Sequence, residues 1–564
     1  MEHLNRKLIT YCLFIAATAL LVLHLLSMRW CIYLSPALFW IAITLMLGTI
    51  VYQCFKIELS PFFTKSVLLE IAVTGFALHM IYQIPTYGLR GSDAYKDMAS
   101  AKGIMLSGFV MGKPQYINLT SYFPIIHILG VIISSVTGLD LLSVVKWFPS
   151  LFDAGLILLL YLLVRGIFKE EKVALLSVLM FAFLENHMLF SSVFVRETIA
   201  LVLAVGCLYF YFSAKHSQNP ATYYVLSIMF LIETVFAHHL TSFMLLVFLA
   251  THFIVTKMFN VSFLRRAFSG YNINGERITT SFLSLSFVAI FSYWTYVVTS
   301  PIVGLATFLI DVFTPGGYGV RSYAQMSGII GTAIQTIRGR ILLYGFYLFH
   351  AVFGLILAYG LLSKEKNRRI EAYSFTFFFF ICGLGGFLSL YAVAPAAFPD
   401  RFLTFGWLLG FAPLVKTILR SKYKWLRKGY IILLIGFMLF NIYIVDPNYW
   451  DLKAVGVPTS TSKEDYALAS GFNFSNSRIL GFQNPLMAIY DVHNDLGAII
   501  SLLEVNLADY SWVIIQKGVL ELEKENYQKP RAGAVVLENL VTNGSIGYNR
   551  IYESNNLLIF KLRK

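Results

Sequence analysis

The sequence predicts a polytopic α-helical membrane protein with about thirteen spanning helices and a small carboxy-terminal α/β domain outside the membrane. Its 564 residues are 57% hydrophobic and only 13% charged, whereas about 25% charged is usual for soluble domains. Apolar stretches long enough to cross a bilayer recur through residues 1–446. Positive charges gather in alternate connecting segments, as they do on the cytoplasmic side of membrane proteins.

Each predicted span follows from its length, since a crossing needs roughly 17–25 mostly apolar residues. The predicted spans are 8–27, 33–53, 66–84, 148–168, 172–190, 197–214, 221–237, 240–257, 281–299, 341–362, 371–392, 402–418 and 429–446. Two shorter apolar stretches, 123–136 and 302–312, are expected to be interfacial or re-entrant helices in outer loops.

The charge pattern also predicts the orientation of the chain. With a cytoplasmic amino terminus, the basic groups at 165–172 and 416–428 lie inside the cell. An odd number of crossings then places residues 447–564 outside, and the chain fits a multi-pass protein of a plasma membrane. The net charge of +14 is explained by this topology, so no nucleic-acid partner is predicted.

The composition changes at Pro447, where acidic and basic residues become nearly balanced. Within 447–564, residues 510–516 predict a buried strand and 494–507 an amphipathic helix. Residues 549–562 predict a hairpin. These elements together indicate a small soluble α/β domain.

The largest outer loop, 85–147, contains the first candidate for chemistry. Ser92 can cap a helix that begins at Asp93, and Asp97 lies four residues further on the same helix face. A carboxylate there can deprotonate an acceptor hydroxyl or, as a pair, hold a divalent cation such as Mg or Mn. A capped and solvated helix explains the same spacing, and the spacing alone favours that plainer interpretation.

A few arginines on the predicted outer side form the second group of candidates: Arg196, Arg321 and Arg401. A guanidinium group can bind the oxygens of a lipid phosphate in a fork. Anchoring at the membrane interface is the alternative role of each.

Three histidines on the predicted outer side are further candidates. His238 and His239 occupy a turn between two spans, and His127 lies in the predicted interfacial helix. One of them can orient a substrate or a carboxylate. The alternative is that they are simply imidazoles at the interface.

Several of these passages resemble the GT-C superfamily of polyprenyl-phosphate-dependent glycosyltransferases, in particular the protein mannosyltransferases and aminoarabinose transferases. The passages are Gly91–Tyr95, Tyr122–His127 with the following residues to Arg165, Arg196–Ala200, and His238–Ser242. The chain departs from that family in having two extra spans before the key loop. It also lacks the Asp-Glu pair of the mannosyltransferases and the histidine that often follows the aspartate in archaeal relatives.

The resemblance implies transfer of a sugar from a polyprenyl-phosphate or dolichyl-phosphate donor to a glycan, lipid or protein acceptor at the outer membrane face, normally with inversion. It implies that Asp93 is the general base or helps to position the acceptor. It also implies a group of residues that bind the substrate or the lipid phosphate: Arg196, Arg321, Arg401, His238, His239, Tyr95, Asp97 and His127. A divalent cation, if one takes part, would lie on Asp93 and Asp97.

Two other activities fit a chain of this type. One is that of a polymerase or oligosaccharyltransferase acting on lipid-linked glycans, although polymerases usually have their large outer loop late in the membrane part. The other is transport, which often shows inverted repeats with interrupted helices in matching halves. No such paired interruption is evident in the sequence.

Overall fold

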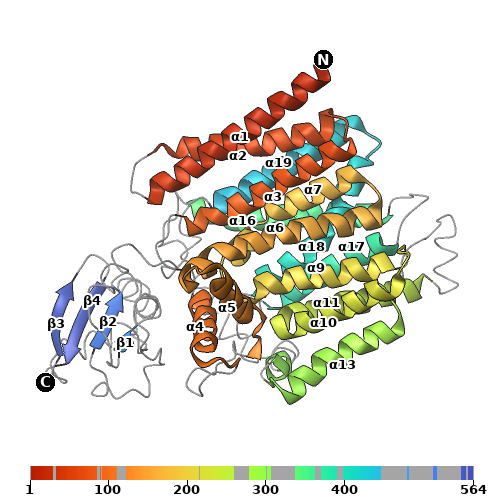
Figure 1. Cartoon of the computed structure of the whole chain (residues 1–564). Coiled ribbons are helices and arrows are strands. Elements are labelled where there is room, and N and C mark those ends of the chain that lie inside the picture. The colour runs from red at the N-terminus through yellow and green to blue at the C-terminus, as the bar shows by residue number, and fades with distance from the viewer. Residues whose placement is uncertain are drawn as a thin grey trace.

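The computed structural model is a bundle of long helices with a separate four-stranded sheet from the end of the chain (Figure 1). It describes residues 2–29, 34–84, 89, 92–110, 122–214, 216–259, 278–299, 301–306, 337–362, 370–389, 398–445, 479–481, 512–516, 548–553 and 557–562.

Within these ranges, ten helices are long and apolar enough to cross a membrane. They are α1 (Glu2–Arg29), α2 (Pro36–Lys56), α3 (Pro61–Gln83), α6 (Leu141–Phe168), α9 (Arg196–Ala214), α10 (Pro220–Ala237), α11 (His239–Met258), α17 (Ile370–Ser389), α18 (Phe398–Leu419) and α19 (Lys424–Val445). Two further helices, α13 (Thr280–Tyr296) and α16 (Ile337–Leu362), occupy the predicted spans 281–299 and 341–362. A multi-pass membrane protein is therefore confirmed, and the number thirteen stays a prediction.

One predicted span is wrong as a single helix. Residues 172–190 form two helices, α7 (Glu171–Ala182) and α8 (Glu185–Ser191). The backbone leaves the helical conformation at Phe183, whose φ is −93° and ψ is 7°. Phe183 and the following Leu184 are both buried. Hydrophobicity alone therefore gives no sign of the break.

Close packing holds the bundle together, because apolar side chains gain little by leaving lipid for a protein interior. Trp407 stacks on Phe411 within α18, with ring centroids 4.6 Å apart, and Phe353 of α16 meets Trp407 edge to face. Between α9 and α10, the ring of Phe230 lies directly over Gly206. The absence of a side chain at Gly206 lets the two helices approach.

Two shorter helices lie together at one end of the bundle, α4 (Ser92–Ser107) and α5 (Ile125–Thr137) (Figure 1). The short helix predicted at 123–136 is thereby confirmed. It ends at Gly138, whose φ of 71° is a left-handed conformation that suits glycine. Of the second predicted short helix, 302–312, residues 301–306 are helical and the rest lies outside the described residues.

The carboxy-terminal strands are β1 (Ile479–Gly481), β2 (Trp512–Gln516), β3 (Tyr548–Glu553) and β4 (Leu557–Leu562), in the sheet order β1-β2-β4-β3. β1 runs parallel to β2, whereas β4 pairs antiparallel with β2 and β3. The predicted strand and hairpin are thus confirmed. The predicted helix 494–507 lies outside the described residues, so the α/β domain as a whole stays a prediction.

We expect Gly206→Ala to destabilise the bundle, because its new methyl group would lie 2.5 Å from two ring carbons of Phe230. Overpacking of this kind costs about 1–3 kcal/mol. Gly155→Ala in α6 is the matched control, since nothing lies within 4 Å of its methyl position. Thermal unfolding in detergent should show a lower midpoint for Gly206→Ala alone. Equal midpoints for both variants would mean that the Phe230 ring moves aside freely.

Candidate functional site

The starts of three spanning helices meet α4 and α5 at one end of the bundle. Arg196 is the first residue of α9, His239 is the first of α11, and Arg401 lies in the first turn of α18. One ion pair joins the start of α9 to α4, a second joins α18 to α9, and His239 contacts Phe123, two residues before α5. Most of the polar residues singled out in the sequence therefore lie in one place.

The centre of this site is a buried carboxylate, Asp97 of α4. The Nε2–H of His127 in α5 donates a hydrogen bond of 2.9 Å to Asp97 Oδ1. Arg196 Nε lies 3.4 Å from the same oxygen. The Asp97 and His127 side chains are fully buried and that of Arg196 is 13% exposed. A buried carboxylate is stable only with such partners, so the three residues fix one another in place.

The guanidinium group of Arg196 keeps capacity for a further partner. Its buried Nη1 makes no hydrogen bond within the described part of the chain. The guanidinium carbon lies 5.7 Å from the centre of the Phe123 ring, which supports the group from one side. A planar fork with a buried, unpaired N–H is suited to an oxygen of a phosphate or carboxylate.

A second ion pair lies beside the first. Arg401 Nε is 3.8 Å from Glu197 Oε2, and the two side chains are 20% and 5% exposed. Glu197 thus points toward α18. Successive residues of a helix point in different directions, so Glu197 is not expected to face the same way as Arg196. The site contains two cations and two carboxylates, each held between helices that are distant in sequence.

The two adjacent histidines complete one wall of the site. His238 Nδ1 lies 2.9 Å from Thr241 Oγ1, and the His239 ring lies 5.4 Å from Phe123. Burial, followed by repulsion from His239, Arg196 and Arg401, holds the pKa of His238 well below its usual range. His238 is therefore neutral at physiological pH, and the arginines supply the positive charge.

Asp93 differs from Asp97 in burial, although the two lie four residues apart in α4 as predicted. Its side chain is 53% exposed and lies 3.2 Å from Lys96 Nζ. Ala94 and Met98 of α4 are part of a buried apolar cluster. Asp93, in the first turn of the same helix, is not part of that cluster. Asp97 Oδ1 faces two N–H donors, and the divalent cation on Asp93 and Asp97 stays a prediction.

Two of the predicted site residues cannot be placed. Arg321 and the side chain of Tyr95 lie outside the described residues. Sequence reasoning also missed two residues that shape the site, Phe123 and Tyr293. The Tyr293 hydroxyl of α13 donates a hydrogen bond to the Tyr122 carbonyl, just before Phe123. Tyrosines near the ends of predicted spans were the available signal.

No protein-family model and no curated protein sequence matches the chain. The crystal structure of the Archaeoglobus fulgidus oligosaccharyltransferase, tethered to an acceptor peptide with the NVT sequon, is 12% identical, with a TM-score of 0.48 over 89% of this chain and 74% of that one. Apo ArnT from Cupriavidus metallidurans is 9% identical, with a TM-score of 0.48 over 88% and 98%.

At these scores the likeness alone establishes neither the fold nor the activity of this chain.

We expect Asp97→Asn to destabilise the protein far more than Asp93→Asn. Removing the charge of Asp97 leaves Arg196 buried beside a neutral amide, and breaking a buried pair in this way costs about 3–5 kcal/mol. Asp93 forms an exposed pair with Lys96, and such pairs contribute about 0–1 kcal/mol. Thermal unfolding in detergent should show a much lower midpoint for Asp97→Asn than for Asp93→Asn. Equal shifts would show that the Asp97 cluster does not stabilise the fold.

Proposed function

We propose that the chain is a membrane glycosyltransferase that moves a sugar from a polyprenyl-phosphate donor to an acceptor hydroxyl at the outer membrane face. The observation that carries the proposal is the buried guanidinium group of Arg196, which has an unpaired Nη1 and lies where three spanning helices begin. This is a site for an anion at one face of a membrane. A lipid-linked phosphate approaches that face from the adjacent leaflet.

The chemistry requires a cation beside the departing phosphate. As the bond from the anomeric carbon to the phosphate oxygen breaks, its electron pair passes to that oxygen and adds negative charge. Arg196 is held by Asp97, and Arg401 by Glu197, so both guanidinium groups are in place before the reaction. Pre-positioned donors of this kind stabilise developing charge most effectively.

The attacking group needs a base on the solvent side. Asp93 is exposed in the first turn of α4, where an acceptor hydroxyl in solvent can reach it. It accepts the proton of the acceptor hydroxyl as that oxygen bonds to the anomeric carbon. Attack on the face opposite the phosphate inverts the configuration. The acceptor is a glycan, a lipid or a protein.

The position of the site distinguishes this proposal from transport. Transporter sites lie near the bilayer midplane at interrupted helices. Here Arg196 and His239 are the first residues of their helices. With a cytoplasmic amino terminus, alternate crossings place these helix starts outside, on the side of residues 447–564. A polymerase acting on lipid-linked glycans has no specific observation in its favour.

The proposal predicts that Arg196→Ala lowers transfer from labelled polyprenyl-phosphate sugars by roughly 10²–10³-fold, the usual effect of losing a donor to developing charge. Arg196→Lys should recover only part of the rate, because an ammonium group lacks the planar fork. Arg420→Ala is the control, since Arg420 pairs with Glu170 on an exposed surface distant in the chain. Wild-type rates for Arg196→Ala would overturn the phosphate-binding role.

A second variant tests the base. Asp93→Asn should lower the transfer rate by about 10²–10⁴-fold, the contribution typical of a general base, without lowering the unfolding midpoint. Release of polyprenyl phosphate by purified protein is the readout. Asp140→Asn serves as control, because Asp140 is an exposed carboxylate that caps α6 through Ser143. Full activity of both Asp93→Asn and Asp93→Ala would assign the base to another residue.

A further inference from the structure

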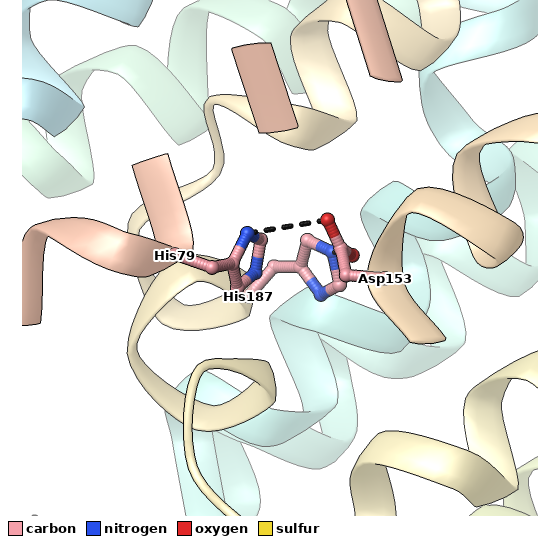
Figure 2. A group of neighbouring side chains, drawn as sticks. All are labelled: His79, Asp153 and His187. Atoms are coloured by element: carbon pink, nitrogen blue, oxygen red, sulfur yellow. Dashed lines mark hydrogen bonds and ion pairs between the residues drawn. The ribbon is translucent and has the colours of Figure 1, made fainter. Parts of the chain in front are cut away.

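Three ionisable side chains meet inside the bundle and share no residue with the site described above. They are His79 of α3, Asp153 of α6 and His187 of α8, and Figure 2 shows the two imidazole rings beside the carboxylate. All three are fully buried side chains. One nitrogen or oxygen atom from each lies within 4.8 Å of the others.

The carboxylate of Asp153 lies between the two rings. His187 Nε2 is hydrogen-bonded to Asp153 Oδ1, and His79 Nδ1 lies 3.2 Å from Oδ2. Despite that proximity, Oδ2 has no hydrogen bond of acceptable geometry within the described residues. A carboxylate in a spanning helix is costly unless a positive charge compensates it.

The ligand atoms that these three side chains offer indicate which metal ion could supply the positive charge. Two imidazoles and one carboxylate are ligands that zinc prefers, whereas calcium and magnesium prefer oxygen alone. Three protein ligands occur in zinc sites that keep a water in the fourth position. One zinc ion would offset the charge of Asp153 while both histidines stay neutral.

The surroundings resemble the outer shell of a metal site. Zinc-bound histidines usually pair their second ring nitrogen with a carbonyl, carboxylate or water. His79 Nδ1 faces Asp153 and also lies 2.7 Å from the Gly75 carbonyl oxygen, so the second ring nitrogens are His79 Nε2 and His187 Nδ1. Ser191 Oγ lies 2.7 Å from His79 Nε2 and 3.1 Å from His187 Nδ1. Each ring therefore has a polar partner besides Asp153, which limits its rotation.

Gly75 gives the carboxylate room to enter. A methyl group at Gly75 would lie 2.4 Å from Ile157 Cδ1 and 3.2 Å from Asp153 Oδ2. Glycine thus allows α3 and α6 to approach at the level of the cluster. The close approach brings His79 and Asp153 together.

We propose that His79, Asp153 and His187 form a buried zinc site that joins α3, α6 and α8. The metal fixes α8, the short helix after the break between α7 and α8. Only Ser192–Val195 separates α8 from Arg196, and Gln83 donates a hydrogen bond to the Ser192 carbonyl. The zinc site therefore anchors the segment that leads to the phosphate-binding arginine. It does not depend on the proposed transfer activity.

The experiment is metal analysis of the full chain, purified in detergent, loaded with Zn²⁺ and dialysed. Elemental analysis should find about one zinc per chain in the wild type, and less than about a fifth of that in Asp153→Asn or His187→Gln, because each loses a ligand. His252→Gln is the matched control. His252 is also a fully buried histidine in a spanning helix, packed against Phe212, and its loss should leave the zinc content unchanged.

A second measurement uses the wild type alone, in case the variants fail to fold. Chelation should lower the midpoint of thermal unfolding, and added Zn²⁺ should restore it, because a ligand that binds only the folded state stabilises it. The proposal is overturned if the wild type retains no zinc and its midpoint does not respond. It is also overturned if the ligand variants retain as much zinc as the wild type. Either result would mean that Asp153 and the histidines form a hydrogen-bonded network without metal.

Discussion

A buried carboxylate must have a positive partner or hydrogen-bond donors, and this constraint organises the bundle. Asp97, Asp153 and Glu197 are each buried within a helix. Asp97 is paired with His127 and Arg196, and Glu197 with Arg401. Leaving any of these carboxylates without its partner would cost several kcal/mol. The pairs therefore determine which helices lie together.

These pairs matter more in a membrane than they would in water. Apolar surfaces associate weakly in lipid, so packing, hydrogen bonds and ion pairs must select one arrangement of helices. The Asp97 pairs join α4, α5 and α9, and the Glu197 pair joins α9 to α18. The start of α9 is common to both. Arg196 is held there by α4, and the next residue, Glu197, by α18, and neither helix is a neighbour of α9 in sequence.

The sequence predicts the membrane elements well because hydrophobic length and positive charge are local properties. It also singled out Asp97, His127, Arg196 and Arg401, since ionisable residues near membrane level are rare. The ion pairs between these residues could not be predicted. Glu197, for example, pairs with Arg401, which lies 204 residues (401 − 197) further along the chain. The break at Phe183 was hidden by its apolar side chain.

Asp93 and Asp97 show the same limit on a smaller scale. Four residues apart on one helix, they were expected to share a face, yet one is exposed and the other fully buried. Ala94 and Met98 belong to the buried apolar cluster that α4 contacts. Asp93, in the first turn of the helix, is exposed beside it. Spacing gives the direction of a side chain along a helix. It does not say where the neighbouring helix ends.

The direction of the helices is a further argument for the proposed anion site. α9 begins at Arg196, α11 at His239 and α18 at Phe398, so three amino-terminal ends face the same region. Each helix end carries a partial positive charge from its unpaired N–H groups. These partial charges add to the positive charge of the two guanidinium groups. Burial beside that positive charge also lowers the pKa of His238. An anionic ligand would relieve this repulsion, whereas a cationic ligand would increase it.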